Sequence, residues 1–149
     1  MDVLLRKLNE IKSATDEALT ARSPLQRYPD VEKELQDKWE DELKAAIEAE
    51  YRRQRADLLL VLERWLRDVW VESIQGSSSP TQKPKASGQN PEAELLNFPA
   101  IAATKRVAGR ITEKDGAENL EVMEQLHRSL GTNVQEALAL EVGLLKLRL

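Results

Sequence analysis

The stretch T-N-V-Q-E-A-L-A-L-E-V-G-L-L-K-L-R, residues 132–148, decides the fold class of this chain. Asn133 is a favourable N-cap residue, and the helix that follows it is apolar on almost every side. Its apolar positions are Ala137, Leu138, Leu140, Val142, Leu144, Leu145 and Leu147. Because such a helix is not stable with its whole surface in water, we expect it at the centre of a helical bundle or in an interface between subunits.

The composition favours a protein made only of helices. Of the 149 residues, 32% are charged, 41% are hydrophobic and only 4% are aromatic, and six are glycine. A β-sheet needs more aromatic and β-branched residues than this. The length suits one domain with a core of its own. We therefore expect a single all-α domain over residues 1–149.

The composition also excludes several classes of protein. The chain has no cysteine, so it has no disulfide and no thiolate metal site, which is compatible with the cytoplasm. Its longest apolar run, residues 58–62, is too short to span a membrane, and the N-terminus lacks the order of a signal peptide. A net charge of -4 argues against nucleic-acid binding by bulk electrostatics. We expect a cytoplasmic protein with no membrane contact.

The first half of the chain predicts one ordinary helix and one very long one. Helical spacing of apolar residues covers residues 3–20, and two prolines within residues 21–30 end that helix. Asp30 is the expected cap of a helix over residues 31–74. Its apolar positions recur mostly every four residues: Val31, Leu35, Trp39, Leu43, Ile47, Tyr51, Leu58, Leu62, Leu66, Val69 and Trp70. A strict four-residue repeat drifts around a straight helix, so the helix should wrap over its neighbours, bend, or break near residues 52–55.

The second half predicts a loop and three more helices. Residues 76–91 contain three prolines and almost no apolar side chain, so we expect a flexible, disordered loop within the domain. Asn97 is the expected cap of a helix that runs to Ile111. Thr112 begins another, which Gly131 ends. The buried stripe of that helix should hold Leu120, Met123, Leu126 and Leu130. With the final helix, the chain should form a five-helix bundle.

We find no pattern that carries catalytic chemistry. Glu124 and His127 have the E-x-x-H spacing of di-iron bundles, but such a site needs a second histidine and the chain has one. A half-exposed histidine near a helix end explains it better. Phosphate-binding glycine motifs and the G-x-S-x-G nucleophile motif are absent. We therefore predict no catalytic, cofactor-binding or metal-binding residues, no small-molecule substrate and no enzyme activity.

Trp65 and Trp70 lie five positions apart, about 140° around a helix. One ring should face the bundle and the other a rim or a partner surface, unless both lie in the core of a helix buried on two sides. Arg67 and Asp68 are sequence neighbours and cannot share a helix face, so each should find a separate partner.

Two segments resemble a known family. L-L-L-V-L-E-R-W-L-R-D-V-W, residues 58–70, is similar to the leucine-rich run and W-L-R-D-L-L pattern in the C-terminal domain of bacterial clamp-loader subunits of DNA polymerase III, the delta-prime subunit above all. The ending, residues 133–147, resembles the closing helix of that family, with Gln135 and Gly143 as departures from its pattern. The resemblance covers about residues 55–149.

The resemblance implies a helical collar domain. In that family the collars of five subunits form a ring that holds the clamp loader together while other domains open the sliding clamp. The partners would be other clamp-loader subunits, with DNA and the clamp contacted only indirectly. The residues implied at subunit interfaces are Trp65, Arg67, Asp68, Trp70, Leu140 and Leu144.

A different class of protein remains open. The apolar stripe from Val31 to Tyr51 would also suit a free-standing helical adaptor that self-associates through its long acidic helix. The absence of a sustained heptad pattern with paired charges argues against it. Co-purification with clamp-loader subunits would distinguish the two hypotheses.

Overall fold

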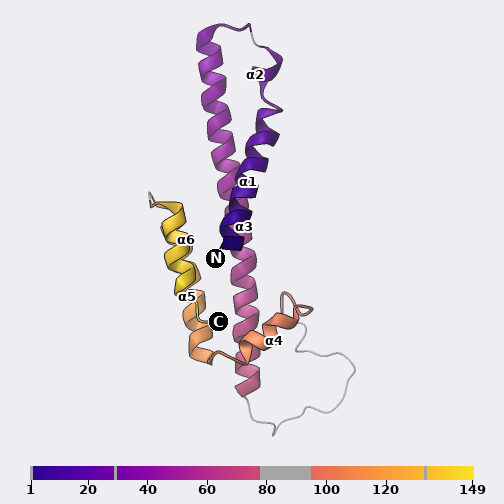
Figure 1. Cartoon of the computed structure of the whole chain (residues 1–149), viewed down its shortest axis with the longest axis vertical. Helices are drawn as coiled ribbons and strands as arrows, with labels where there is room; N and C mark the ends of the chain where they lie inside the picture. The colour runs from indigo at the N-terminus through magenta and orange to yellow at the C-terminus, as the bar shows by residue number, and fades with distance from the viewer. Residues whose placement is uncertain (1, 29, 78–94, 133) are drawn as a thin grey trace. The chain divides into compact units, whose positions relative to one another are not determined.

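The computed structural model describes residues 2–28, 30–77, 95–132 and 134–149 (Figure 1). These ranges contain six helices and no strand, which confirms the all-α prediction. The helices are α1 (Asp2–Thr20), α2 (Pro24–Arg27), α3 (Lys33–Ser77), α4 (Ala102–Ala108), α5 (Glu113–Leu130) and α6 (Glu136–Leu145). None of the described helices is both long enough and apolar enough to cross a membrane.

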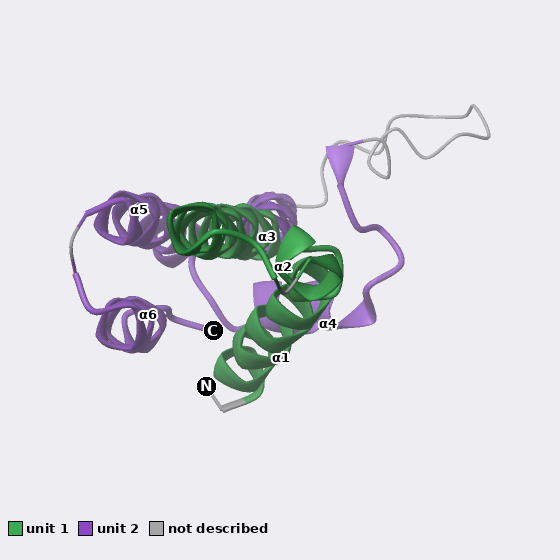
Figure 2. Ribbon diagram, turned by 90° about the horizontal axis from the view of Figure 1, so that it is seen from above, with its two compact units in different colours: residues 1–58 green, residues 59–149 purple. Residues whose placement is uncertain are grey.

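The chain divides into two compact units, residues 1–58 and 59–149, coloured green and purple in Figure 2. Unit 1 holds α1, α2 and the first part of α3, whereas unit 2 holds the remainder of α3 with α4, α5 and α6. The expectation of one domain over residues 1–149 stays a prediction, and each unit is described by itself.

Unit 1 has a small core between α1 and α3. Leu8 and Tyr51 are buried, and the ammonium group of Lys12 lies 5.7 Å from the centroid of the Tyr51 ring. The predicted break after α1 is confirmed, but it contains the short helix α2, which raises the number of helices from five to six. Ser23 caps α2 by accepting a hydrogen bond from the backbone N–H of Leu25, and Pro24 occupies the first turn.

The long helix α3 is continuous, as predicted, although its predicted cap is wrong. It begins at Lys33 rather than beside Asp30, because the carbonyl of Glu32 is the first to accept helical hydrogen bonds. Ion pairs along the helix bridge its polar middle: Arg52 lies 2.8 Å from Glu48, and Arg53 lies 2.7 Å from Glu50. Such pairs stabilise a helix where apolar contacts are few, which explains why it does not break near residues 52–55.

α3 ends three residues later than predicted, at Ser77 rather than at residue 74. The predicted loop began at Gly76, but α3 continues through Gly76 to Ser77. The remainder of the predicted disordered loop, residues 78–91, lies outside the described residues.

Unit 2 contains the larger core. Its buried residues come from all four helices, and they are Leu59, Leu66, Asp68, Val69, Ser73, Thr104, Ala108, Gly116, Asn119, Met123, Leu126, Ala139 and Leu140. Leu66, Val69 and Met123 are at most 1% exposed. Of the apolar residues that we expected on the second half of α3, Leu66 and Val69 lie in this core, whereas the others are only half-buried. Leu59, which was not part of the predicted stripe, is buried as well.

α5 begins as predicted and has part of its predicted stripe. The Thr112 hydroxyl accepts a hydrogen bond from the backbone N–H of Asp115, whose carboxylate accepts one from the backbone N–H of Thr112, so the capping box is complete. Met123 and Leu126 are buried. The other two residues of the stripe, Leu120 and Leu130, are only half-buried. Gly131 ends the helix at the C-cap in a right-handed conformation, so no left-handed turn is needed there.

The prediction for α4 is wrong at both ends. The helix covers Ala102–Ala108, so it begins four residues later and ends three residues earlier than expected. Ile101 precedes it without a side-chain cap. Asn97, the expected cap, instead donates its hydrogen bonds to Asp68, so its side chain is not available to a helix start.

Candidate assembly surface

The carboxylate of Asp68 holds the segment before α4 against α3. It is fully buried and accepts hydrogen bonds from the backbone N–H of Asn97 (3.0 Å), the side-chain amide of Asn97 (2.8 Å) and the backbone N–H of Phe98 (2.7 Å). Arg67 donates to the carbonyl of Leu95 at 2.9 Å. Arg67 and Asp68 therefore have different partner residues, as predicted, although these partners lie in one short segment of the same chain and not in another helix or subunit.

The side chains of Arg67 and Asp68 also approach one another. Arg67 Nη1 lies 3.6 Å from Asp68 Oδ1, because both side chains turn toward residues 95–98. These contacts are made within unit 2. The side chains of Arg67 and Asp68, which we expected at a junction with another subunit, are thus used in contacts within the chain.

Trp65 and Trp70 each lie against another helix of unit 2, and the two helices differ. The indole N–H of Trp65 donates to the hydroxyl of Thr104 in α4 at 3.1 Å. Trp70 contacts α5 at Gly116, where a Cβ atom would lie only 2.5 Å from Trp70 Cδ1. Both rings are half-buried, and each fixes one neighbouring helix to α3.

The final helix α6 has one buried face and one exposed face. Ala139 and Leu140 are buried, with Leu140 only 1% exposed, so Leu140 is a core residue of unit 2. Leu144 is half-buried. On the other side, Leu138, Val142 and Leu145 are 52%, 44% and 69% exposed, and we call these three residues the outer face of α6.

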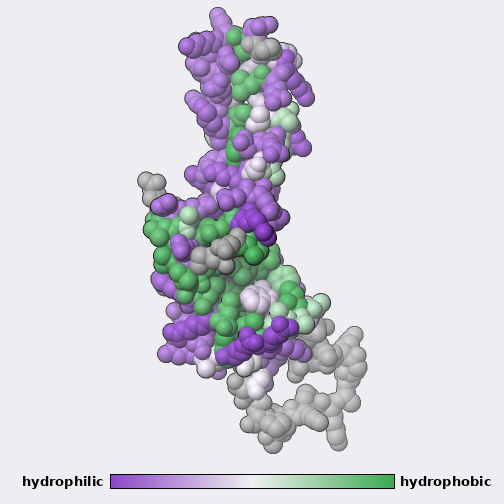
Figure 3. Space-filling model, viewed as in Figure 1, coloured by the Kyte–Doolittle hydropathy of each residue, from purple (hydrophilic) through white to green (hydrophobic). Residues whose placement is uncertain are grey.

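The exposed face bears on one of our two expectations for this helix. We expected α6 either at the centre of a bundle or in an interface between subunits. Figure 3 shows hydrophobic side chains gathered over α5 and α6 of unit 2. Since the outer face of α6 is open, α6 is not the centre of a bundle within the described residues. The interface expectation stays a prediction.

A groove of about 240 Å³ runs between α5 and α6 beside this face. Its lining is mostly apolar, with Lys146 as its charged member: Val122, Gln125, Leu126, Ser129, Val134, Leu138, Ala139, Val142, Gly143 and Lys146. The two helices approach closely at Gly143, where a Cβ atom would lie 3.1 Å from Leu126 Cδ1. A groove between two helices with an apolar floor can receive the side chains of a third helix.

Asn119 of α5 binds the segment that follows α6 through two hydrogen bonds. The side-chain amide of Asn119 donates to the carbonyl of Arg148, and the backbone N–H of Arg148 donates to Asn119 Oδ1, both at 2.8 Å. The Arg148 guanidinium lies 2.8 Å from Asp115 and 2.9 Å from Glu118. Because residue 148 is held this way, the C-terminal end of α6 is fixed on α5.

The same contacts shift two pKa values. A hydrogen bond from the Thr112 hydroxyl, with a second from Arg148, holds the pKa of the Asp115 carboxyl well below its usual range. The hydrogen bond to Asp115 likewise raises the pKa of Arg148. We did not predict the contact between Asn119 and Arg148 from the sequence. The only local signal was a polar Asn119 four residues before buried Met123 on the apolar side of α5.

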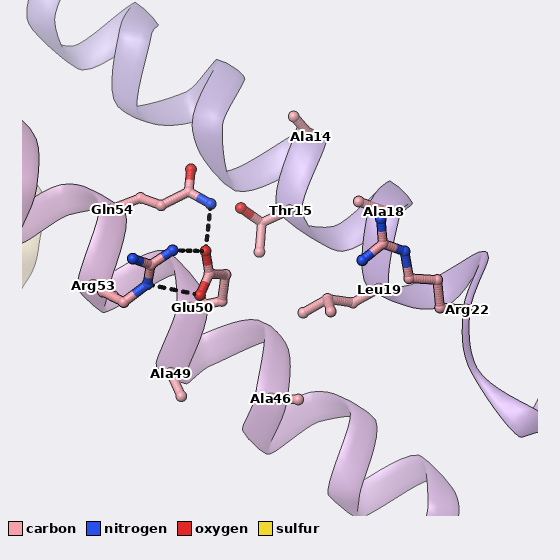
Figure 4. A pocket seen from close by; sticks show the side chains of 10 residues that line it. All are labelled: Ala14, Thr15, Ala18, Leu19, Arg22, Ala46, Ala49, Glu50, Arg53 and Gln54. Atoms are coloured by element: carbon pink, nitrogen blue, oxygen red, sulfur yellow. Dashed lines mark hydrogen bonds and ion pairs between the residues drawn. The ribbon is translucent and has the colours of Figure 1, made fainter.

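Unit 1 has a larger groove of about 650 Å³ between α1 and α3 (Figure 4). Small side chains line it from both helices, including Ala14, Ala18, Ala46 and Ala49. At one end the carboxylate of Glu50 accepts hydrogen bonds from Arg53 and Gln54, and these lower the pKa of Glu50 to about 2. A carboxylate held ionised in this way is a poor proton acceptor at neutral pH.

The described residues do not assemble a metal site. They contain no group of three or more histidine, cysteine, aspartate or glutamate side chains that could hold an ion. His127 Nε2 lies 3.3 Å from Glu63, a residue of α3, and not beside a second E-x-x-H pair.

Comparison with known proteins found no relative: no protein-family model matches the chain, and no curated protein or solved structure matches it significantly. The function is therefore inferred from the residues themselves.

Proposed function

We propose that this chain is a collar-type assembly domain of a bacterial clamp-loader subunit, similar to the delta-prime subunit of DNA polymerase III. Its role would be to hold neighbouring subunits together during sliding-clamp loading in DNA replication. It would have no catalytic residue, and it would meet DNA and the clamp only through its partners.

The observation that carries this proposal is the outer face of α6. Leu138, Val142 and Leu145 are exposed side by side on a helix that has almost no polar side chain. Contiguous apolar surface of this kind marks interaction sites, because burying it against a partner removes it from water. A domain whose task is assembly needs such a surface, whereas an independent monomer does not.

The two segments that resemble clamp-loader collars lie in the same part of the chain as the outer face of α6. Residues 133–147 include α6, and residues 58–70 lie almost wholly in unit 2. In unit 2 the W-L-R-D residues position α4 and the segment before it, through Trp65, Arg67 and Asp68. We therefore assign these residues a supporting role, and we assign partner contact to the outer face of α6.

The rival function, self-association through the stripe from Val31 to Tyr51, has less free surface to use. Tyr51 is only 5% exposed, and the Trp39 ring lies 6.4 Å from the Tyr28 ring within unit 1. Leu35, at 40% exposure, is the large apolar residue of this stripe that remains open.

Co-purification tests the proposal against its rival. A tagged copy of the whole chain is incubated with the remaining clamp-loader subunits of its own organism, and its self-association is measured in parallel. We expect wild type and Leu35→Asp to retain those subunits equally. If no clamp-loader subunit is retained, and Leu35→Asp dissociates a homodimer of the wild type, the adaptor function replaces the collar function.

A further inference from the structure

The outer face of α6 has the arrangement of a short coiled-coil seam. At about 100° per residue, Leu138, Val142 and Leu145 fall within about 60° of one another around the helix. Their spacing of four and then three residues is that of heptad positions d, a and d. Glu141 and Lys146 lie about 40° beyond opposite edges of this stripe, at positions g and e.

The residue types at these positions specify one kind of pairing. A β-branched residue at a, here Val142, with leucine at d favours two parallel strands. In a parallel pair, position g of one helix faces position e of its neighbour five residues further along. Glu141 and Lys146 are five residues apart and opposite in charge, so each Glu141 would meet the Lys146 of a second copy.

Both charged residues are free to make that pairing. In the part of the chain that the structure describes, neither Glu141 nor Lys146 has an ion-pair partner. Lys146 lines the groove between α5 and α6, so a carboxylate that reaches it enters this groove. The contact of Arg148 with Asn119 holds the end of α6 in place.

We propose that a second copy of this chain covers the outer face of α6 when no other subunit is present. The two α6 helices run parallel, Val142 and Leu145 meet their counterparts, and two Glu141–Lys146 pairs flank the seam. Because the seam covers little more than one heptad, the dimer is weak and reversible. This inference does not depend on the proposed function, since it concerns the chain alone.

Charge reversal tests the pairing. The whole chain is followed by sedimentation equilibrium over concentrations from about 1 µM to about 1 mM, the range of weak association. Glu141→Lys and Lys146→Glu each replace two attractive pairs by two repulsive ones, and each should weaken the dimer roughly tenfold. The double variant restores opposite charges across the seam, so its dimer should return to within about twofold of wild type.

Disulfide trapping tests the direction of the helices. The chain has no cysteine, so single replacements are unambiguous. In a parallel pair, Leu138→Cys and Leu145→Cys each lie opposite their own counterpart, and both should form a disulfide-linked dimer on oxidation. An antiparallel pair does not bring both positions together with themselves. Val3→Cys, exposed in unit 1, is the matched control and should not cross-link.

Three results would overturn the inference. They are a wild type that remains monomeric at the highest concentration, a double charge variant no better than the single ones, and failure of either seam cysteine to cross-link. The partner assay stays separate, since it uses clamp-loader subunits. A chain that binds them yet never dimerises would keep the proposed function and lose this inference.

Discussion

Asp68 and Asn97, 29 residues apart in sequence, are joined by two hydrogen bonds to one carboxylate oxygen: the backbone N–H of Asn97 donates at 3.0 Å and its side-chain amide at 2.8 Å. The second oxygen of Asp68 accepts from Phe98 at 2.7 Å. Since Asp68 is fully buried, water does not replace these bonds. The carboxylate thus fixes how the chain enters α4.

Asp68→Ala should destabilise unit 2 by about 3–5 kcal/mol, because it leaves buried donors without an acceptor. Urea unfolding is followed by tryptophan fluorescence in a Trp39→Phe background, so that Trp65 and Trp70 report on unit 2 alone. Asp57→Ala, an exposed aspartate of α3, is the control and should change stability by less than about 0.5 kcal/mol. Equal behaviour of the two variants would show that Asp68 is not an essential acceptor.

Gly116→Ala should destabilise the protein by about 1–3 kcal/mol, although alanine is normally the better helix former. The new Cβ would lie 2.5 Å from Trp70 Cδ1 and 3.1 Å from Trp70 Cβ, so the base of the indole side chain must move. Gly76→Ala, with nothing within 4 Å, is the matched control in α3 and should be neutral or stabilising by up to about 1 kcal/mol. Thermal melts of both variants decide the point, and a stabilised Gly116→Ala would contradict this packing.

Local sequence patterns predicted the helices that are marked by a capping motif or by a regular apolar repeat. The capping box of Thr112 and Asp115 marked the start of α5, and the apolar repeat marked α3. The start of α4 was wrong because Asn97 has two competing uses, and the deciding partner, Asp68, is distant in sequence. No local rule ranks a helix cap against a buried carboxylate far along the chain.

Local sequence patterns also could not predict which face of α6 is buried. When a helix is apolar on nearly every side, its sequence does not show which side faces the core. Leu140 and Leu144 therefore seemed as suitable for an interface as Leu145. The choice depends on the approach of Gly143 to Leu126 and on the contact between Asn119 and the chain end, which only the folded unit supplies. The heptad spacing of the outer face was the one available signal.

Acid should weaken unit 2 through Asp115. Its folded pKa lies below the unfolded value of 3.8, so its contribution to stability is present above about pH 4 and is lost as pH falls toward the folded pKa. Asp115→Asn should therefore lower the urea midpoint at pH 7 and flatten its decline below pH 4. Asp41→Asn, at an exposed position of α3, should leave the decline unchanged. A steeper decline in Asp115→Asn would contradict the assigned pKa direction.

The two faces of α6 should respond differently to truncation. Leu140→Ala should cost about 2–5 kcal/mol, because Leu140 is buried in the core of unit 2. Leu145→Ala should change the free energy of unfolding by less than about 0.5 kcal/mol, because its side chain is 69% exposed. Urea unfolding at a protein concentration below that of any dimer makes the comparison. Similar losses for both would mean that Leu145 is buried within the chain.

The most direct test of the central claim, that the outer face of α6 binds neighbouring subunits, is the affinity of Leu145→Asp for the remaining clamp-loader subunits. We predict a loss of at least about tenfold with an unchanged unfolding midpoint, since a charge placed in an apolar contact opposes burial. Val3→Asp, at a similarly exposed position in unit 1, should bind like wild type. Wild-type affinity for Leu145→Asp, in a chain that binds those subunits, would contradict the claim.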